Sequence, residues 1–235
     1  MRLRHRRGGY RLLRGRGIEI GACHQPAVVP EDCLVEYCDA LPREEVIRRF
    51  PELEGQDLVE VDHLCDLDTQ GLSPFTDGAF DFVILNHVIE HVANPIQVIA
   101  ELFRVTKPNG LIVISAPDKR FTFDRDRALT SFEHLEDEYE RGVTEVTDEH
   151  YLDFLAKVHP EIMSKSEREI RAHVAVVRGR REHAHVWDSR SFGEFLECSF
   201  ERLGIRPERV YASLGDANRF EYFSVWRKPS LAACC

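Results

Sequence analysis

The composition of this 235-residue chain predicts a folded, soluble protein rather than a disordered or membrane-spanning one. Apolar residues make up 43% of the chain, and no stretch approaches the roughly 20 consecutive apolar residues that a membrane span requires. Asp and Glu number 41 against 31 Lys and Arg, so the net charge is −10, which disfavours general nucleic-acid binding. We expect a cytoplasmic monomer or homodimer with no nucleic-acid or membrane partner.

The first half of the chain alternates short apolar runs with amphipathic segments, a pattern typical of β/α units around a parallel sheet. Strands are predicted at residues 17–21, 34–38, 58–65, 80–85 and 111–114. Helices are predicted at residues 43–50 and 95–105, the second with a proline at its start. Residues 22–33 contain Pro26 and Pro30, and we expect a loop there in place of a helix.

The second half changes character after the fifth predicted strand. Residues 118–182 read as charged helical segments without a convincing strand, which predicts a helical cap inserted over the carboxyl edge of the sheet. Residues 183–227 then close the sheet, with a helix predicted at 191–203 and strands at 205–211 and 220–226. With a basic arm at residues 1–16, these parts predict a single α/β domain across residues 1–235, built on a doubly wound, mostly parallel sheet.

The residues that follow the predicted strands are the informative ones, because ligands of open parallel sheets bind beyond the carboxyl ends of the strands. Gly21, Ala22 and Cys23 follow the first strand, and Asp39 and Asp66 follow the second and third. A carboxylate after the second strand suits two adjacent ribose hydroxyls, and one after the third can accept from the exocyclic amine of adenine. Their order predicts a nucleoside ligand.

Four motifs occur in the right order and spacing to resemble a known family. They are GIEIG at 17–21, Asp66 with LSPFTDGAFDFV at 72–83, NHVIEHV at 86–92 and RVTKPNG at 104–110. This series resembles the class I S-adenosylmethionine-dependent methyltransferases of the small-molecule type. The resemblance implies a Rossmann-like, seven-stranded sheet with an antiparallel last strand, and S-adenosylmethionine lying across the strand ends as cofactor.

The resemblance also implies residue roles in binding the cofactor. Glu19 and Gly21 match the acid and the glycine near the methionine part of the cofactor, and Ala22 and Cys23 are further contacts. Asp39 matches the acid that binds the ribose, and Asp66 with Leu67 matches the pair that contacts the adenine. Asn86 and His87 match the position that faces the methyl group. Cys23 departs from the family, which has a second glycine there. The missing helix after the first strand is a second departure, and it reduces the help of a helix dipole for the cofactor carboxylate.

Methyl transfer to a hydroxyl needs a positioned acceptor and a base. His87, His91 and His134 are the candidate catalytic residues, although packing under the cap is an alternative for His91. Asp118, Lys119 and Arg120 leave the fifth strand toward the same edge and are candidate substrate-binding residues. The alternatives for them are a solvated face or an internal ion-pair network with residues 124–127.

The pair His183 and His185 has the H-x-H spacing of metal ligands, but the sequence indicates no third ligand. Structural histidines are the favoured interpretation, so no metal site is predicted.

The predicted function is transfer of a methyl group to a small polar acceptor. Residues 117–127, with Thr130 and His134, resemble a bacterial subgroup found with sugar- and glycan-modifying proteins, which suggests an oxygen of a sugar or related metabolite as the acceptor. Two other classes stay open: a noncatalytic S-adenosylmethionine-binding or scaffold protein, which the altered Cys23 position permits, and a nucleic-acid methyltransferase that uses the N-terminal arginines.

Overall fold

A computed structural model describes residues 3–230 and contains one seven-stranded sheet. Its strands are β1 (Arg16–Ile20), β2 (Leu34–Asp39), β3 (His63–Leu64), β4 (Phe80–Asn86), β5 (Thr106–Pro117), β6 (Glu208–Ser213) and β7 (Glu221–Arg227). They lie in the order β3-β2-β1-β4-β5-β7-β6, and β7 alone runs antiparallel to its neighbours β5 and β6. The predicted doubly wound, mostly parallel sheet with an antiparallel last strand is therefore confirmed.

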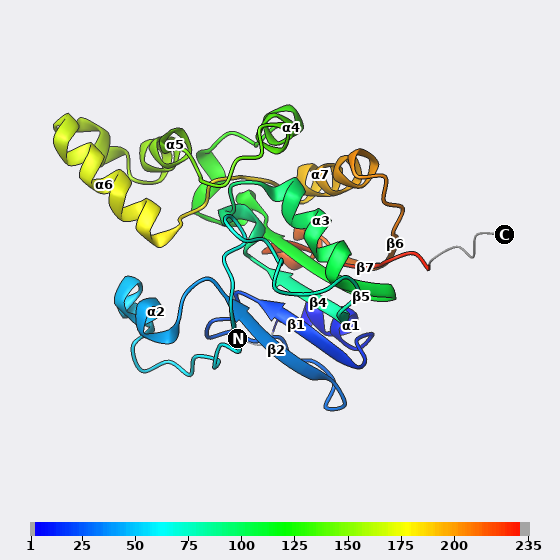
Figure 1. Cartoon of the computed structure of the whole chain (residues 1–235). Helices are drawn as coiled ribbons and strands as arrows, with labels where there is room; N and C mark the ends of the chain where they lie inside the picture. The colour runs from blue at the N-terminus through cyan, green and yellow to red at the C-terminus, as the bar shows by residue number, and fades with distance from the viewer. Residues whose placement is uncertain (1–2, 231–235) are drawn as a thin grey trace.

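Helices form where the sequence has amphipathic segments, and α3 and α7 pack against the sheet (Figure 1). The helices are α1 (Arg7–Tyr10), α2 (Arg43–Arg49), α3 (Pro95–Val105), α4 (Phe132–Glu140), α5 (Asp148–Val158), α6 (Glu167–Arg180), α7 (Ser189–Arg202) and α8 (Gly215–Asn218). Asn94 caps α3 by accepting a hydrogen bond from the backbone N–H of Gln97 at 3.0 Å, and α3 then buries an apolar face against the sheet. Asp188 caps α7 in the same way.

The third and the fifth predicted strands differ most in length from those of the structure. The third strand was predicted at residues 58–65, but β3 contains only His63 and Leu64, because it is an edge strand that pairs with just Cys38 and Asp39. The fifth strand is longer than residues 111–114, since β5 already pairs with Phe80 at Thr106 and includes Asn109 at a positive φ of 63°. The absence of a helix from residues 22–33 is confirmed.

The N-terminal segment packs on the sheet rather than extending away from it. Residues 4–6 form a 3-10 helix that leads into α1, and the buried Arg6 donates two hydrogen bonds to Glu221 at 2.6 and 2.5 Å. His5 contacts the same carboxylate at 2.5 Å. Burial opposes ionisation of Glu221, yet the hydrogen bonds from His5, His87 and Arg6 hold its pKa well below the ordinary value. Part of the predicted basic arm thus neutralises a buried acid at the start of β7.

Residues 118–182 contain α4, α5, α6 and three short 3-10 helices, and no strand occurs among them. Apolar side chains of α5 and α6 form a separate cluster, with Tyr151, Phe154 and Leu155 against Val174 and Val177, whereas Leu135 of α4 belongs to the main core. Figure 1 shows these helices gathered on one side of the molecule, with the end of α6 near α2. We call residues 118–182 the cap. Among residues 3–230, no helix combines the length and apolar character needed to cross a bilayer.

Candidate functional site

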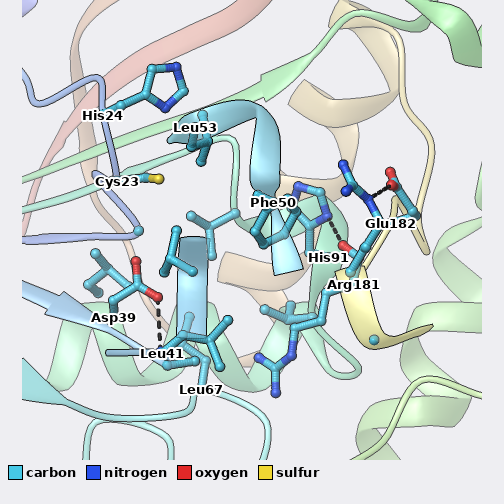
Figure 2. Close-up of a pocket in the computed structure, with 18 of the residues that line it drawn as sticks. Cys23, His24, Asp39, Leu41, Phe50, Leu53, Leu67, His91, Arg181 and Glu182 are labelled. Carbon is cyan, nitrogen blue, oxygen red and sulfur yellow. Dashed lines mark hydrogen bonds and ion pairs between the residues drawn. The ribbon is translucent and has the colours of Figure 1, made fainter. Parts of the chain in front are cut away.

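A cavity of about 430 Å³ lies where the carboxyl ends of β1, β2 and β3 meet the end of α6. The sheet contributes Gly21, Asp39 and Leu67, and the cap contributes residues 179–182. Figure 2 shows Asp39 and Cys23 on one side of the cavity and Arg181 with Glu182 on the other. The size is that of a small-molecule binding site, and the position is the one expected for an open parallel sheet.

Asp39 ends β2 and presents its carboxylate to this cavity. Its Oδ1 accepts a hydrogen bond from the backbone N–H of Leu41 at 3.2 Å, which fixes the side chain at the strand end (Figure 2). Burial raises the pKa of this carboxyl above its ordinary value. A ligand that donates hydrogen bonds to the carboxylate would relieve that desolvation, as two ribose hydroxyls would do.

Gly21 and Cys23 shape the backbone directly after β1. Gly21 has a φ of 71°, and a Cβ added there would lie 2.5 Å from Cγ2 of Val88, so only glycine fits. Cys23 stands where the family that the sequence resembles has its second glycine, and its φ is 49°. The backbone therefore keeps a conformation that favours glycine although the residue is not glycine. Both residues line the cavity, whereas Ala22 is buried beside it.

Glu19 lies beneath the loop of residues 22–33 rather than in the cavity lining. Both carboxylate oxygens accept from the backbone N–H of Ala27, at 2.9 and 3.1 Å. Burial raises the pKa of Glu19 to about 7. This acid thus holds the loop that replaces the expected helix, and a direct contact with a cofactor stays a prediction.

Asp66 forms an ion pair with Arg181, a cap residue of the cavity lining, while its Oδ1 accepts from the backbone N–H of Asp68 at 3.0 Å. Its neighbours Cys65 and Leu67 line the cavity, but Asp66 itself does not. The sequence did not predict a role for Arg181 at this edge of the sheet. The predicted adenine-contacting acid therefore has a competing partner in this structure.

Asn86 and His87 end β4 close to the N-terminal segment. Asn86 donates to the Tyr10 hydroxyl at 3.0 Å and accepts from Ser115 at 3.0 Å, so its amide is engaged away from the cavity. His87 has a positive φ of 53°, and its Nε2 lies 2.7 Å from Glu221 Oε2. The strained backbone directs the His87 ring onto Phe220, with the ring centroids 5.1 Å apart.

His91 lines the cavity on the cap side, as Figure 2 shows. Its Nδ1 lies 2.6 Å from the backbone oxygen of Arg181, which accepts a hydrogen bond from the ring. Burial lowers the pKa of His91 to about 4, so the imidazole is neutral at pH 7. A neutral ring oriented by a carbonyl can bind a polar group in the cavity.

The remaining candidates lie outside the cavity lining. The Asp118 carboxylate is fully buried and accepts from Arg120 Nε at 2.9 Å and from the Ser189 backbone N–H at 3.0 Å. Lys119 donates to the backbone oxygen of Arg127. His134 lies on α4, half-exposed and next to Glu138. Asp118 and Arg120 thus pair with each other, and Arg120 also pairs with Asp216, rather than with residues 124–127 as the alternative interpretation had it.

Part of the chain is similar to a methyltransferase family and to proteins named as methyltransferases. Residues 43–114 match the family described as a methyltransferase domain, which is just under a third of the chain. An uncharacterized methyltransferase of Mycobacterium leprae is 50% identical over 42 residues, covering 18% of this chain and 16% of that protein. A protein of Mycolicibacterium smegmatis named as a probable S-adenosylmethionine-dependent methyltransferase is 39% identical over 61 residues, or 25% and 23% of the two chains.

These curated relatives are thus matched over less than a quarter of their own length. Among solved structures, the PH0226 protein of Pyrococcus horikoshii is similar with a TM-score of 0.49 and 15% identity, over 97% of this chain and 89% of that one.

Proposed function

We propose that the chain is an S-adenosylmethionine-dependent methyltransferase that methylates a small polar acceptor. The cavity at the ends of β1, β2 and β3 carries this proposal, because Asp39 and Gly21 line it at the positions that a nucleoside and a close backbone approach require. The match of residues 43–114 to a methyltransferase domain supports the same activity. The net charge of −10 favours a small acceptor over a nucleic acid.

The residues around the cavity fit the cofactor. The Asp39 carboxylate suits the two ribose hydroxyls, and Gly21 lines the cavity with backbone that carries no side chain. Leu41, Phe50 and Leu67 offer apolar surface for the faces of a purine ring. When bound, S-adenosylmethionine supplies the electrophilic methyl group, and the chain contributes binding, orientation and exclusion of water.

An oxygen of a sugar or a related metabolite is the acceptor that we propose. The cap side of the cavity carries polar groups, namely His91, Arg181 and Glu182, which can hydrogen-bond a hydroxylated molecule. Because the His91 ring is neutral with a pKa of about 4, it is better suited to orienting an acceptor hydroxyl than to holding its proton. His87 remains the second candidate at this edge of the sheet.

Calorimetric titration with S-adenosylmethionine and with S-adenosylhomocysteine tests the proposed cofactor. The wild-type chain should bind both, and Asp39→Ala should bind at least about tenfold more weakly, or about 1.4 kcal/mol. Asp57→Ala is the matched control, because Asp57 is an exposed acid outside the cavity lining, and it should bind as the wild type does. A wild-type chain that binds neither compound would refute the proposal, and unchanged affinity in Asp39→Ala would refute the ribose assignment.

Labelled S-adenosylmethionine then identifies the acceptor class. Panels of sugars, phenols, carboxylates and RNA are offered to the wild-type chain, and we expect label in the sugar panel. Transfer to RNA alone would instead support the nucleic-acid alternative. Cofactor binding without transfer to any panel would support a noncatalytic binding protein.

A further inference from the structure

Glu90 is a buried carboxylate at the carboxyl edge of the sheet with no hydrogen-bond donor among the described residues. It lies in the 3-10 helix at residues 89–91, directly after β4, and it is 1% exposed. Neither Oε1 nor Oε2 has a hydrogen-bond partner. An isolated buried carboxylate costs several kcal/mol, so native proteins pair such a group or use it to bind a cation.

Three histidine rings lie around this carboxylate, and each has a ring nitrogen at a similar distance from Glu90 Oε1. Glu90 Oε1 lies 3.7 Å from His91 Nε2, 3.9 Å from His183 Nε2 and 3.9 Å from His87 Nδ1. These distances are too long for hydrogen bonds. Two donors that each lie about 2.1 Å from a shared tetrahedral ion are about 3.4 Å apart, so small movements would bring the groups to an ion.

The other nitrogen of each ring already has an acceptor. His91 Nδ1 lies 2.6 Å from the Arg181 backbone oxygen, His183 Nδ1 lies 2.6 Å from Asp124 Oδ2, and His87 Nε2 lies 2.7 Å from Glu221 Oε2. A hydrogen bond at one ring nitrogen leaves the lone pair of a neutral ring on the other nitrogen. That nitrogen faces Glu90 in all three rings. Metal-binding histidines typically show the same arrangement, in which one ring nitrogen binds the metal and the other donates a hydrogen bond to a protein acceptor.

The backbone also ties the third ligand to Glu90. The backbone oxygen of Glu90 accepts from the N–H groups of Ala184 and His185 at 2.8 and 3.0 Å. This contact brings residues 183–185, at the end of the cap, to the residues that follow β4. Of the H-x-H pair, only His183 lies beside the Glu90 carboxylate, because His185 contacts the backbone oxygen of Val92 and belongs to a different cluster.

We propose that Glu90, His91 and His183 hold a divalent transition-metal ion of the zinc type, with His87 beside it. Their donor atoms all lie within 4.8 Å of one another. Two imidazoles and one carboxylate form a donor set found in catalytic zinc sites, which keep a further position for water or substrate. Magnesium is disfavoured, because it prefers oxygen ligands.

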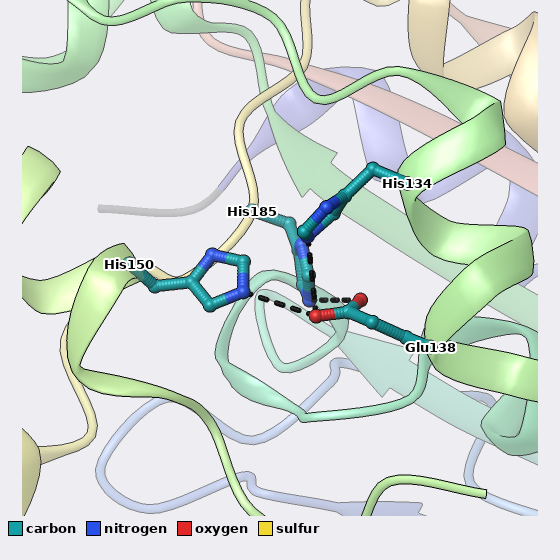
Figure 3. Close-up of side chains that lie close together, drawn as sticks. All are labelled: His134, Glu138, His150 and His185. Carbon is teal, nitrogen blue, oxygen red and sulfur yellow. Dashed lines mark hydrogen bonds and ion pairs between the residues drawn. The ribbon is translucent and has the colours of Figure 1, made fainter. Parts of the chain in front are cut away.

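A second cluster, formed by side chains of α4 and α5 with His185, has similar residues but different contacts (Figure 3). Glu138 Oε1 is 3.0 Å from His150 Nε2 and 3.2 Å from His134 Nε2, so this oxygen already has direct partners, whereas Oε2 lies 3.6 Å from His185 Nε2 and has no hydrogen-bond partner. His185 Nε2 lies 3.0 Å from the backbone oxygen of Val92. We call His134, Glu138, His150 and His185 the Glu138 cluster, and it is the internal control for the proposed site.

The position of the ion deepens the proposed function, on which this step rests. His91 lines the cofactor cavity, so the free coordination position of an ion on His91 would lie at its cap side. An acceptor oxygen, from a hydroxyl or a carboxylate, is the ligand class that suits this position. The ion would thus bind and orient the acceptor.

Zinc titration of the chelator-treated, full-length chain tests the site. The wild type should bind one equivalent of Zn²⁺ that is lost in Glu90→Gln and in His183→Asn, and Mg²⁺ should not bind there. His134→Ala and His150→Ala, in the Glu138 cluster, should keep the equivalent. Loss of zinc from these two variants with retention in Glu90→Gln would overturn the assignment.

The absorption spectrum of bound Co²⁺ distinguishes loss of a metal ligand from loss of the fold. His91→Ala removes a ligand that is partly exposed, with 28% of the side chain accessible, so the variant should fold as the wild type by circular dichroism. It should nevertheless lose the visible bands of tetrahedral Co²⁺, and bands unchanged from the wild type would overturn the site.

The same samples separate this proposal from the methyltransferase proposal. One equivalent of zinc without S-adenosylmethionine binding would keep the metal site and reject the enzyme. Cofactor binding and methyl transfer by a chain that binds no zinc would reject the metal site and keep the enzyme.

Discussion

The cavity has two walls that are held in place by different forces. We call the residues at the ends of β1, β2 and β3 the sheet wall and residues 179–182 the cap wall. The sheet wall is set by the strand ladder, in which Ile20 pairs with Cys38 and Asp39 pairs with Leu64. The cap wall is attached to the rest of the chain by side-chain ion pairs, since Arg180 pairs with Glu52 at 2.6 Å and Arg181 pairs with Asp66. Partly exposed ion pairs contribute little stability compared with a buried ladder. The comparison therefore indicates a firm sheet wall and a cap wall that can adjust to a ligand.

The largest expected effect lies inside the cap, at Arg127. Its guanidinium is 2% exposed and contacts Asp124 at 2.9 Å, Asp153 at 2.8 Å and the His183 backbone oxygen at 2.8 Å. Arg127→Ala leaves Asp124 buried without this partner, so we expect a loss of about 3–5 kcal/mol in the free energy of unfolding. Urea denaturation measures it.

Arg125→Ala is the matched control for this prediction, because Arg125 is 74% exposed and lies 3.9 Å from Asp126. Its effect should stay within about 0.5 kcal/mol. Equal effects of the two substitutions would show that buried charge does not hold the cap together.

The sheet wall should respond to pH through Glu19. Its pKa of about 7 in the folded chain exceeds the ordinary value of 4.5, so folding favours the protonated acid. The stabilisation is complete below about pH 4.5 and is lost as the pH rises through 7, a change of about 3 kcal/mol. Glu19→Gln should remove this part of the pH dependence, which denaturation at several pH values measures.

Glu60→Gln removes an exposed acid and should retain the wild-type pH dependence. If Glu19→Gln retained it as well, burial of Glu19 would not be its source.

The smallest effect is expected at the cap wall, for cofactor binding by Arg181→Ala. Arg181 forms an ion pair with the Asp66 carboxylate, and the family resemblance implies that this carboxylate accepts a hydrogen bond from the adenine amine. Removing this competitor should tighten S-adenosylmethionine binding about two- to fivefold, the scale of a partly exposed ion pair. Calorimetry measures the change.

Arg171→Ala removes an exposed ion pair with Glu167 elsewhere on α6 and should leave cofactor affinity unchanged. Weaker binding by Arg181→Ala would mean that Arg181 contacts the cofactor directly and that the cap wall is part of the cofactor site.

The sequence predicted the sheet wall better than the cap wall, and particular residues show why. Gly21 and Asp39 lie in the cavity lining because strand ends follow from local hydrophobic patterns, which the sequence displays directly. Asp118 and Arg120 follow the fifth strand as predicted, yet they pair with each other. Asn86 turns toward Tyr10, which comes from a segment 76 positions earlier, and no local pattern indicates that contact.

The sequence by itself determined the order of the β/α units, the loop at residues 22–33 and the acids and glycine at the strand ends, because each depends on neighbours along the chain. Only the tertiary structure decided which charges meet. It pairs Arg181 with Asp66 and brings His183 beside Glu90, which lie 115 and 93 positions apart in the chain. Such contacts depend on how the cap packs against the sheet, and packing is a property of the whole fold rather than of any one segment.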